Sequence, residues 1–349
     1  MLARSRQALR GEVMIGYYIH HQGRGHLQRA RSIGRHLAVP TTMLSSLPRP
    51  DDADRWISLP LDDASRPADH TALGTLHWVP RHDHGLRRRM AIIAEWIDDA
   101  QPDLVVVDVS VEVAVLCRLM GIPTVVMAMP GDRSDRAHRS AYDSAHAILA
   151  PWPAEFSASQ WSDRWSDRTF HVGAISRYAG RRPQPAKCEG GPIRVLVLWG
   201  NGGGGPPVEA VAAASRATPE CQWRIAGTGD AAGTPVWDQL SWADVVVTHG
   251  GQNAVAEVAA AGRPAVVIAE SRPHDEQLAT VRTLDRAGLA VGLESFPEPS
   301  QWPAVLAAAM KIGGEHWQRW APADAAIRAA DFLSRTARDV RQTVDETVA

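Results

Sequence analysis

The chain has 349 residues, of which 45% are hydrophobic and 22% charged, and its formal net charge is −2. This composition is typical of a soluble globular protein with two domains of about 150 residues each, and it argues against binding nucleic acid by bulk charge. The cysteines, at positions 117, 188 and 221, lie far apart without a C-x-x-C pair, which predicts reduced thiols in a cytoplasmic protein and no zinc site.

The first apolar run extends from Val13 to Ile19, after residues 1 to 12, which we expect to be a disordered leader. The run is too short to cross a membrane and leads straight into charged sequence. It therefore predicts a buried first strand rather than a signal peptide. No stretch of the sequence reaches the apolar length of a membrane span.

Gly23 and Gly25 permit a tight turn after this strand, ahead of a run with helical spacing of apolar residues. His26 therefore lies where a strand meets a helix, and its side chain can project into a cleft. The dinucleotide fingerprint G-x-G-x-x-G is incomplete, because Gln28 holds its third glycine position and no acidic residue ends the next strand, 41–45. A nicotinamide or flavin site is disfavoured.

Two patterns between residues 48 and 85 are of a kind that metal sites also use. Asp52 and Asp54 have D-x-D spacing, and His82, Asp83 and His84 are consecutive. Both patterns lie in loop-like sequence with no apolar strand before them, so we interpret them as solvated loops and expect no metal.

The stretch from residue 86 to 100 predicts an amphipathic helix. Its run of Arg87, Arg88 and Arg89 is interpreted as a solvated first turn. Contact with a membrane surface or an acidic acceptor is the alternative.

The next strand, LVVVD, ends at Asp108, just before a helix predicted at 111–120. Spacing alone leaves two roles open for this carboxylate, a site residue or the N-cap of that helix. Further strands at 124–128 and 147–150 continue an alternation of strands and helices that predicts a doubly wound parallel sheet. The tryptophan-rich stretch from Trp152 to Trp165 is a packed surface loop or part of an acceptor-binding wall.

A segment rich in Gly, Pro and charge, 173–192, is typical of a linker between domains. The strand after it, 193–198, opens into a glycine run that is a candidate phosphate or sugar loop, with plain flexibility as the competing interpretation. A third strand has its own glycine turn. The candidate ligand-binding residues in these two turns are Gly200, Asn201, Gly202, Gly203, Gly227 and Thr228.

The most informative stretch extends from Trp242 to Gln277. A short strand is broken by His249, Gly250 and Gly251 where a helix begins, and the N–H groups of a helix's first turn favour a phosphate. Asn253 and Glu257 follow on that helix one turn apart. A second strand, 265–268, ends in a polar cluster that includes Asp275, Glu276 and Gln277.

These residues resemble the motifs of GT-B glycosyltransferases, in particular the nucleoside-diphosphate-sugar transferases of plants, antibiotic pathways and peptidoglycan synthesis. The donor signature H-x-G-x-N-x-x-x-E is matched by His249, Gly251, Asn253 and Glu257, and the acidic residues before Gln277 look like its D/E-Q end. Gly25-His26 resembles the N-terminal G-H loop of the family. Gln252 departs from the tryptophan of the plant motif.

The resemblance implies two facing Rossmann-like domains, an acceptor domain at 13–172 and a donor domain at 193–349, joined by the linker 173–192, with a C-terminal helix that returns to the first domain. It implies that the donor diphosphate rests on His249 to Gly251 and on the glycine run, that Glu257 binds the ribose, and that Asp275, Glu276 and Gln277 bind the sugar.

By the same resemblance, His26 is the general base and Asp108 its acid partner, with a helix cap or a phosphate ligand as the other interpretation of His26. The transfer is expected to need no metal and no cofactor and to invert the anomeric centre, because no pair of glutamates seven residues apart lies near the donor site. We expect a UDP- or dTDP-sugar donor, an unidentified small-molecule or lipid-linked acceptor, and a place in the cytoplasm or at the inner membrane face. A nucleotide-sugar 2-epimerase and a non-catalytic donor-binding subunit are the alternatives.

Overall fold

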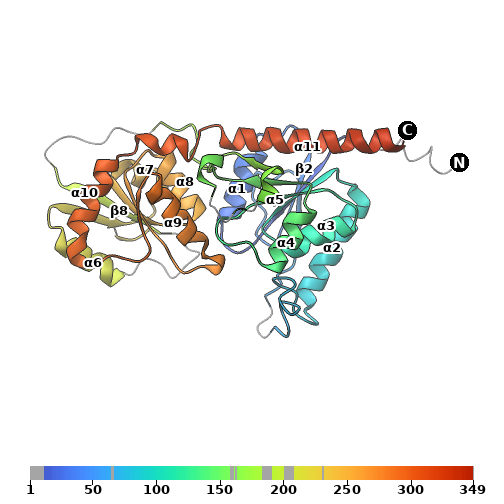
Figure 1. Ribbon diagram of the computed structural model, residues 1–349, viewed down its shortest axis with the longest axis horizontal. Helices are drawn as coiled ribbons and strands as arrows, with labels where there is room; N and C mark the ends of the chain where they lie inside the picture. The colour runs from blue at the N-terminus through green and yellow to red at the C-terminus, as the bar shows by residue number, and fades with distance from the viewer. Residues whose placement is uncertain are drawn as a thin grey trace.

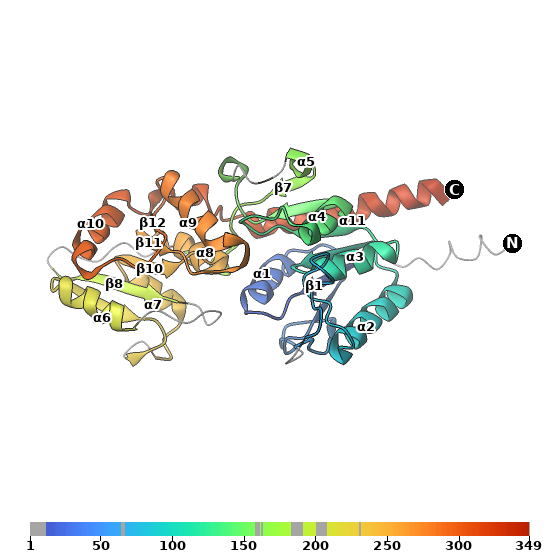
Figure 2. The same cartoon turned by 60° about the horizontal axis from the view of Figure 1, so that its bottom comes forward.

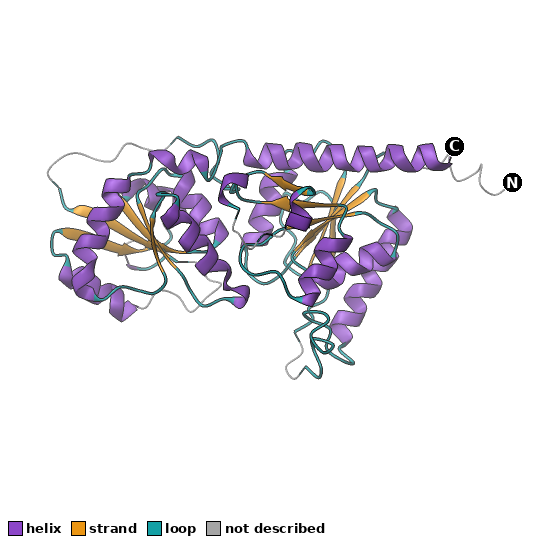
Figure 3. Cartoon of the chain, viewed as in Figure 1, coloured by secondary structure: helices purple, strands orange, loops and turns teal. Residues whose placement is uncertain are grey.

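Two parallel sheets lie side by side along the long axis of the computed structural model, and each has its own helices (Figure 1). The structure describes residues 12–63, 67–157, 161, 163–182, 191–199, 208–229 and 232–348. The described residues form one seven-stranded and one five-stranded sheet, with helices on the faces of both (Figure 3). The predicted fold class of two doubly wound parallel-sheet domains is confirmed.

The N-terminal sheet has the strand order β3-β2-β1-β4-β5-β6-β7, and every neighbouring pair is parallel. All residues of the central strands β1 and β4 are buried, which explains their continuous apolar sequences. The strand order reverses between β1 and β4, the place where open parallel sheets bind ligands. The strands are β1 (Ile15–Ile19), β2 (Thr41–Ser45), β3 (Trp56–Ser58), β4 (Leu104–Asp108), β5 (Thr124–Met127), β6 (Ala147–Ala150) and β7 (Thr169–His171).

Side-chain caps begin three of the helices around this sheet. Asp83, Ser110 and Asp135 each accept a hydrogen bond from a backbone N–H in the first turn of α2, α3 and α4, which fixes where these helices begin. The helical elements are α1 (Gly25–Gly34), α2 (His84–Ala100), α3 (Val111–Leu119), α4 (Arg136–Ser144), η2 (Ala154–Phe156) and α5 (Asp163–Ser166).

Arg89 corrects the interpretation of the three-arginine run as a solvated turn. Arg87 and Arg88 are exposed, but Arg89 is only 2% exposed and is held by the carboxylate of Asp62, 2.6 Å from its Nη1, and by the carbonyl of Pro60. A buried guanidinium needs such partners, because an unpaired charge in the interior costs several kcal/mol (about 3–5).

The C-terminal sheet has the order β12-β11-β10-β8-β9, again parallel throughout. Its order reverses between β8 and β10. The strands are β8 (Ile193–Leu198), β9 (Cys221–Ile225), β10 (Val245–His249), β11 (Ala265–Ile268) and β12 (Val291–Leu293). The helical elements are α6 (Val208–Ala217), α7 (Val236–Trp242), α8 (Gln252–Ala260), η4 (Pro273–Asp275), α9 (Glu276–Arg286), η5 (Pro299–Gln301), α10 (Trp302–Ile312) and η6 (Glu315–Arg319).

The last helix, α11 (Ala325–Val348), leaves the C-terminal domain and lies along the N-terminal one (Figures 1 and 2). Its small residues let it approach the sheet closely: Ala329 and Ala330 are fully buried in a cluster with Ile15 and Ile33. Arg341 adds a salt bridge, with its Nε 2.5 Å from Asp103 Oδ1. None of the helices in the described residues is both long and apolar enough to cross a membrane.

Candidate functional site

The ends of β1 and β4 bring together a histidine, a carboxylate and a guanidinium. Ile19 is in register with Asp108, so the loop after β1 lies beside the end of β4. His26 Nδ1 is 2.9 Å from Asp108 Oδ1, while Arg29 contacts both carboxylate oxygens, with Nε 3.1 Å from Oδ2 and Nη2 2.5 Å from Oδ1. Val109, next to Asp108, has φ +62°, a strained conformation for a β-branched residue and one found at ligand sites.

Asp108 orients the imidazole of His26 and does not cap α3, since Ser110 does so. Burial alone would raise the pKa of Asp108, but the charges of Arg29 and His26 outweigh it and hold this pKa well below its usual range. Asp108 therefore stays a carboxylate and accepts a hydrogen bond from His26 Nδ1–H. In the tautomer that donates from Nδ1, the other ring nitrogen, Nε2, carries no proton, and 17% of the His26 side chain is exposed.

The same cluster reaches the C-terminal domain through the start of α8. Arg29 Nη1 donates a hydrogen bond to Gln252 Oε1 at 2.8 Å. Gly25, the first residue of α1, lies against Asn253, and a Cβ atom added to Gly25 would be 2.2 Å from Asn253 Nδ2. The G-H loop of one domain therefore contacts the donor motif of the other.

This close approach predicts a specific effect of Gly25→Ala. The added methyl group forces Asn253 away and changes how the domains meet, and a displacement of about 1 Å at a reacting centre costs on the order of 10²-fold in rate. For the sugar transfer that the motif resemblance implies, we expect a loss of this size in kcat, with the melting temperature close to that of the parent chain. Gly34→Ala, in the same helix, is the matched control, because its Cβ meets only the flexible end of Met43 at 2.9 Å. Equal activity of both variants would contradict the proposed contact.

The turn between β10 and α8 is closely packed at its two glycines. A Cβ on Gly250 would lie 2.9 Å from the Gln277 carbonyl oxygen, and one on Gly251 would lie 2.3 Å from the His249 ring, so both positions require glycine. His249 Nδ1 accepts a hydrogen bond from the Gly251 N–H at 3.1 Å, and burial lowers the pKa of His249, so its ring is neutral. The first-turn N–H groups of α8 and its dipole favour a phosphate at this point.

Glu257 lies one turn further along α8 and is paired with the linker. Its Oε1 is 2.8 Å from Arg177 Nε, and burial raises the pKa of Glu257 while Arg177 opposes the shift. Arg177 also stacks over the ring of Tyr178, with its Cζ 4.7 Å from the centroid. A ribose that binds Glu257 must therefore share this carboxylate with Arg177 or displace it.

The three residues predicted to hold the sugar have different surroundings. Asp275 is exposed and has φ +52°, while Glu276 forms a salt bridge across the domain interface, its Oε2 3.1 Å from Arg133 Nη2. Gln277 is buried and turned inward: its Oε1 accepts a hydrogen bond from the Glu270 N–H at 3.1 Å. Asp275 is the member of this set that lies open to solvent.

The glycine turns are described in part. Gly227, with φ +79°, and Thr228 form an exposed turn after β9, at the same sheet edge as His249. Gly200, Asn201, Gly202 and Gly203 lie outside the described residues.

The D-x-D pair and the His82–His84 run, which the sequence predicted to be solvated loops, do not form a metal cluster among the described residues. Asp52 pairs with Arg31, its Oδ2 2.6 Å from Nη2, and Asp83 caps α2. His82 and His84 are exposed and contribute to no metal-like cluster of the described residues.

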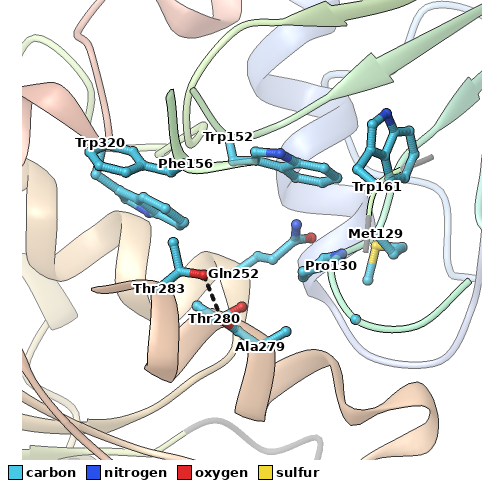
Figure 4. Close-up of a pocket in the computed structure, with 11 residues that line it drawn as sticks. Met129, Pro130, Trp152, Phe156, Trp161, Gln252, Ala279, Thr280, Thr283 and Trp320 are labelled. Carbon is cyan, nitrogen blue, oxygen red and sulfur yellow. Dashed lines mark hydrogen bonds between the residues drawn. The ribbon is translucent and has the colours of Figure 1, made fainter. Parts of the chain in front are cut away.

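An apolar pocket lies beside the His26 cluster, between the two domains (Figure 4). Its cavity volume is about 30 Å³, and aromatic rings form much of its wall. Gln252, which accepts the hydrogen bond from Arg29, lines it from the C-terminal side. The lining residues are Met129, Pro130, Gly131, Trp152, Phe156, Trp161, Gln252, Ala279, Thr280, Thr283 and Trp320. Part of the tryptophan-rich stretch is therefore a pocket wall.

Two residues to which the sequence analysis gave no role are central to the site. Glu270 connects several side chains near His249. It accepts hydrogen bonds from Trp199 Nε1 at 3.0 Å and from Arg272 Nη2 at 3.2 Å, and it lies 3.9 Å from His249. Glu270 follows β11 closely, and this position could have predicted it as a site residue, since site residues lie at the carboxyl ends of parallel strands. The contact of Arg177 with Glu257 joins a linker to a distant helix, and no sequence pattern indicates it.

Comparison with known sequences finds a family model that matches part of the C-terminal domain. Residues 234–301 match the model of the glycosyltransferase family 28 C-terminal domain. A curated relative from Rubrobacter xylanophilus, UDP-N-acetylglucosamine–N-acetylmuramyl-(pentapeptide) pyrophosphoryl-undecaprenol N-acetylglucosamine transferase, is 28% identical over 196 residues, covering 50% of this chain and 56% of the relative. The matched region thus spans little more than half of that protein.

Solved structures share the whole architecture. The glycosyltransferase of kitacinnamycin superposes with a TM-score of 0.68 at 17% identity, covering 94% of this chain and 99% of that one. MurG of Acinetobacter baumannii gives 0.62 at 14% identity, with 92% and 99% covered, and the calicheamicin glycosyltransferase gives 0.61 at 19%, with 95% and 100% covered. The resemblance predicted from the motifs is confirmed, and the chain has the GT-B fold.

Proposed function

We propose that this chain is a glycosyltransferase that moves a sugar from a nucleoside-diphosphate-sugar, UDP- or dTDP-linked, to an acceptor hydroxyl with inversion. One observation carries the proposal: Arg29, which shares Asp108 with His26, donates a hydrogen bond from Nη1 to Gln252 Oε1 at 2.8 Å. Gln252 begins α8, so this bond links the His26 cluster to the turn at His249 to Gly251. A base on one domain and an anion site on the other face the same interface. This arrangement suits the attack of an acceptor oxygen on an anomeric carbon.

On the donor side, the diphosphate would rest on the turn from His249 to Gly251 at the N-terminus of α8. The ribose hydroxyls would donate hydrogen bonds to Glu257 in place of Arg177, and Asp275 is exposed and available to a sugar hydroxyl. N–H groups and the helix dipole stabilise the charge that develops on the leaving diphosphate, so this chemistry needs no metal at that point.

On the acceptor side, the aromatic pocket favours a molecule with an apolar body. The acceptor hydroxyl would give its proton to His26 Nε2 as its oxygen bonds to the anomeric carbon and the bond to the diphosphate breaks. The names of the relatives give different acceptors, an N-acetylmuramyl-(pentapeptide) pyrophosphoryl-undecaprenol for the Rubrobacter protein and calicheamicin for another. We propose an apolar aglycone or lipid-linked acceptor, met at the inner membrane face if it is lipid-linked, with exposed Arg87 and Arg88 available to anionic lipid.

The proposal is tested by incubating the full chain with a panel of UDP- and dTDP-sugars, with and without aromatic alcohols and a polyprenyl-diphosphate sugar, and measuring nucleoside diphosphate. We expect release that depends on an acceptor, and a product with inverted anomeric configuration. Release without acceptor, together with an epimerised sugar, would instead identify a 2-epimerase. Nucleotide binding with no turnover for any acceptor would identify a non-catalytic donor-binding subunit, and no binding at all would refute the proposal.

A further inference from the structure

Three imidazoles and one carboxylate converge at the interface between the two domains, apart from the residues assigned above. His77 lies in the loop before α2, Asp135 caps α4, His138 lies in the first turn of α4, and His274 belongs to η4 of the C-terminal domain. One ligand-type atom from each of the four side chains lies within 4.8 Å of all the others.

Asp135 is at the centre of this cluster. His77 Nε2 is 3.2 Å from Asp135 Oδ1, and His274 Nδ1 is 3.7 Å from Oδ2. His138 Nδ1 also contacts Oδ2. The rings crowd around the carboxylate, with the centroid of His138 4.3 Å from that of His77 and 4.6 Å from that of His274.

This donor set suits a divalent transition metal. Three neutral imidazole nitrogens and one carboxylate oxygen are ligands that zinc takes in tetrahedral sites, with bonds of about 2.0–2.2 Å. Such bonds place the ligand atoms roughly 3.4 Å apart, so the most distant pair, at most 4.8 Å apart, must approach by up to about 1.4 Å, which side-chain rotation can supply. His77, Asp135 and His274 are partly accessible to solvent, which gives an ion a path of entry, while His138 is buried.

The guanidinium of Arg133 lies next to this cluster, and its positive charge would oppose a bound metal ion. Arg133 Nη1 lies 3.3 Å from His138 Nε2, the ring nitrogen that faces away from Asp135. A metal on Nδ1 puts the proton on Nε2, so Arg133 gives up this contact. It keeps the Pro130 carbonyl at 2.8 Å and the carboxylate of Glu276 at 3.1 Å, and Glu276 balances its charge.

The backbone already holds His274 in place against the N-terminal domain. Its carbonyl accepts a hydrogen bond from the Asp132 N–H at 3.0 Å, and a Cβ on Gly131 would lie 2.1 Å from the same oxygen. His274 and Asp275 have φ of +62° and +52°, two strained residues in succession, and strain of this kind occurs at ligand clamps.

We propose that His77, Asp135, His138 and His274 bind one Zn²⁺ ion that fastens the loop at 272–277 of the C-terminal domain to the N-terminal domain. The ion has a structural role and takes no part in the proposed transfer. A test of Zn²⁺ binding is therefore independent of the proposed function. No zinc was expected from the sequence, because cysteines and contiguous patterns were the signals considered. His77 is far in the sequence from Asp135 and His138, and His274 joins these three only because the two domains meet.

The direct test is Zn²⁺ titration of the chelator-stripped full chain in competition with a chromophoric indicator. We expect one Zn²⁺ per chain, and Co²⁺ in its place should give the visible absorption of a tetrahedral site. His274→Ala and His138→Ala should each weaken binding by at least about 100-fold. His146→Ala, an exposed histidine outside the cluster, is the matched control and should bind as the parent chain does. Circular dichroism checks that each variant is folded.

The bound ion makes a second prediction, on the distance between the domains. Small-angle scattering should show a smaller radius of gyration when Zn²⁺ is added to the stripped parent chain and to His146→Ala, and no change for His274→Ala. Absence of stoichiometric Zn²⁺ binding by the parent chain would overturn the proposal. Binding that is lost in His138→Ala but unchanged in His274→Ala would overturn it too, since the site would then lie within one domain.

Discussion

Replacing His26 with asparagine is expected to lower kcat for sugar transfer by about 10²–10⁴-fold, the usual contribution of a general base. His26 is the imidazole whose Nδ1 is fixed by Asp108 at 2.9 Å, and asparagine has no nitrogen that can take the acceptor's proton. Donor binding should be unchanged, because the proposed donor contacts come from the other domain. The measurement is the rate of nucleoside diphosphate release at saturating donor, paired with calorimetric titration of the nucleotide.

The matched control is His146→Asn, an exposed histidine before β6, which should keep the parent rate. If His26→Asn loses nucleotide affinity in proportion to its rate, His26 is a phosphate ligand rather than a base. Full activity of His26→Asn would remove the general-base role altogether.

The carboxyl ends of parallel strands explain why much of this site was predictable. A buried strand that ends in a polar residue places that residue at the ligand-binding edge of the sheet, which located His26, Asp108 and the turn at His249. The pairing of Asp108 with His26 was expected only from the resemblance to the family, because spacing alone left a helix cap open as the other role of Asp108. The fold class followed from the alternation of strands and helices.

Contacts between the two domains could not be predicted from local sequence patterns. The contacts of Gln252 with Arg29, of Glu276 with Arg133 and of His274 with Asp135 all depend on how the two domains face each other, which no spacing in the sequence encodes. The wrong interpretation of Arg89 has a different cause. Arg89 lies four and eight residues before Ile93 and Ile97, so helical periodicity places it on the buried stripe, but its charge and its two arginine neighbours suggested solvent.

Asp108→Asn is expected to lower the free energy of unfolding by about 3 kcal/mol or more, because it leaves Arg29 buried without its counter-charge. Asp108 is fully buried and Arg29 is 4% exposed, so water cannot replace the lost carboxylate. Asp52→Asn is the matched control. It breaks the Asp52–Arg31 pair, which at 2.6 Å is nearly as short as the 2.5 Å Asp108–Arg29 pair, but Asp52 is 49% exposed, and such surface pairs contribute less than about 1 kcal/mol. Urea denaturation followed by circular dichroism compares the two.

The pH dependence of the stability that Asp108→Asn loses gives a second test of the Arg29–Asp108 pair. The pKa of Asp108 in the folded chain lies below its unfolded value of about 4, so its carboxylate stabilises the fold fully above that pH and loses the contribution as the pH falls towards the folded pKa. The difference in unfolding free energy between the parent chain and Asp108→Asn should therefore be constant near neutrality. Below pH 4 it should shrink by up to about 1.4 kcal/mol per pH unit. A cost that equals that of Asp52→Asn, or that stays constant through this acid range, would show that the Arg29–Asp108 pair does not hold the site together.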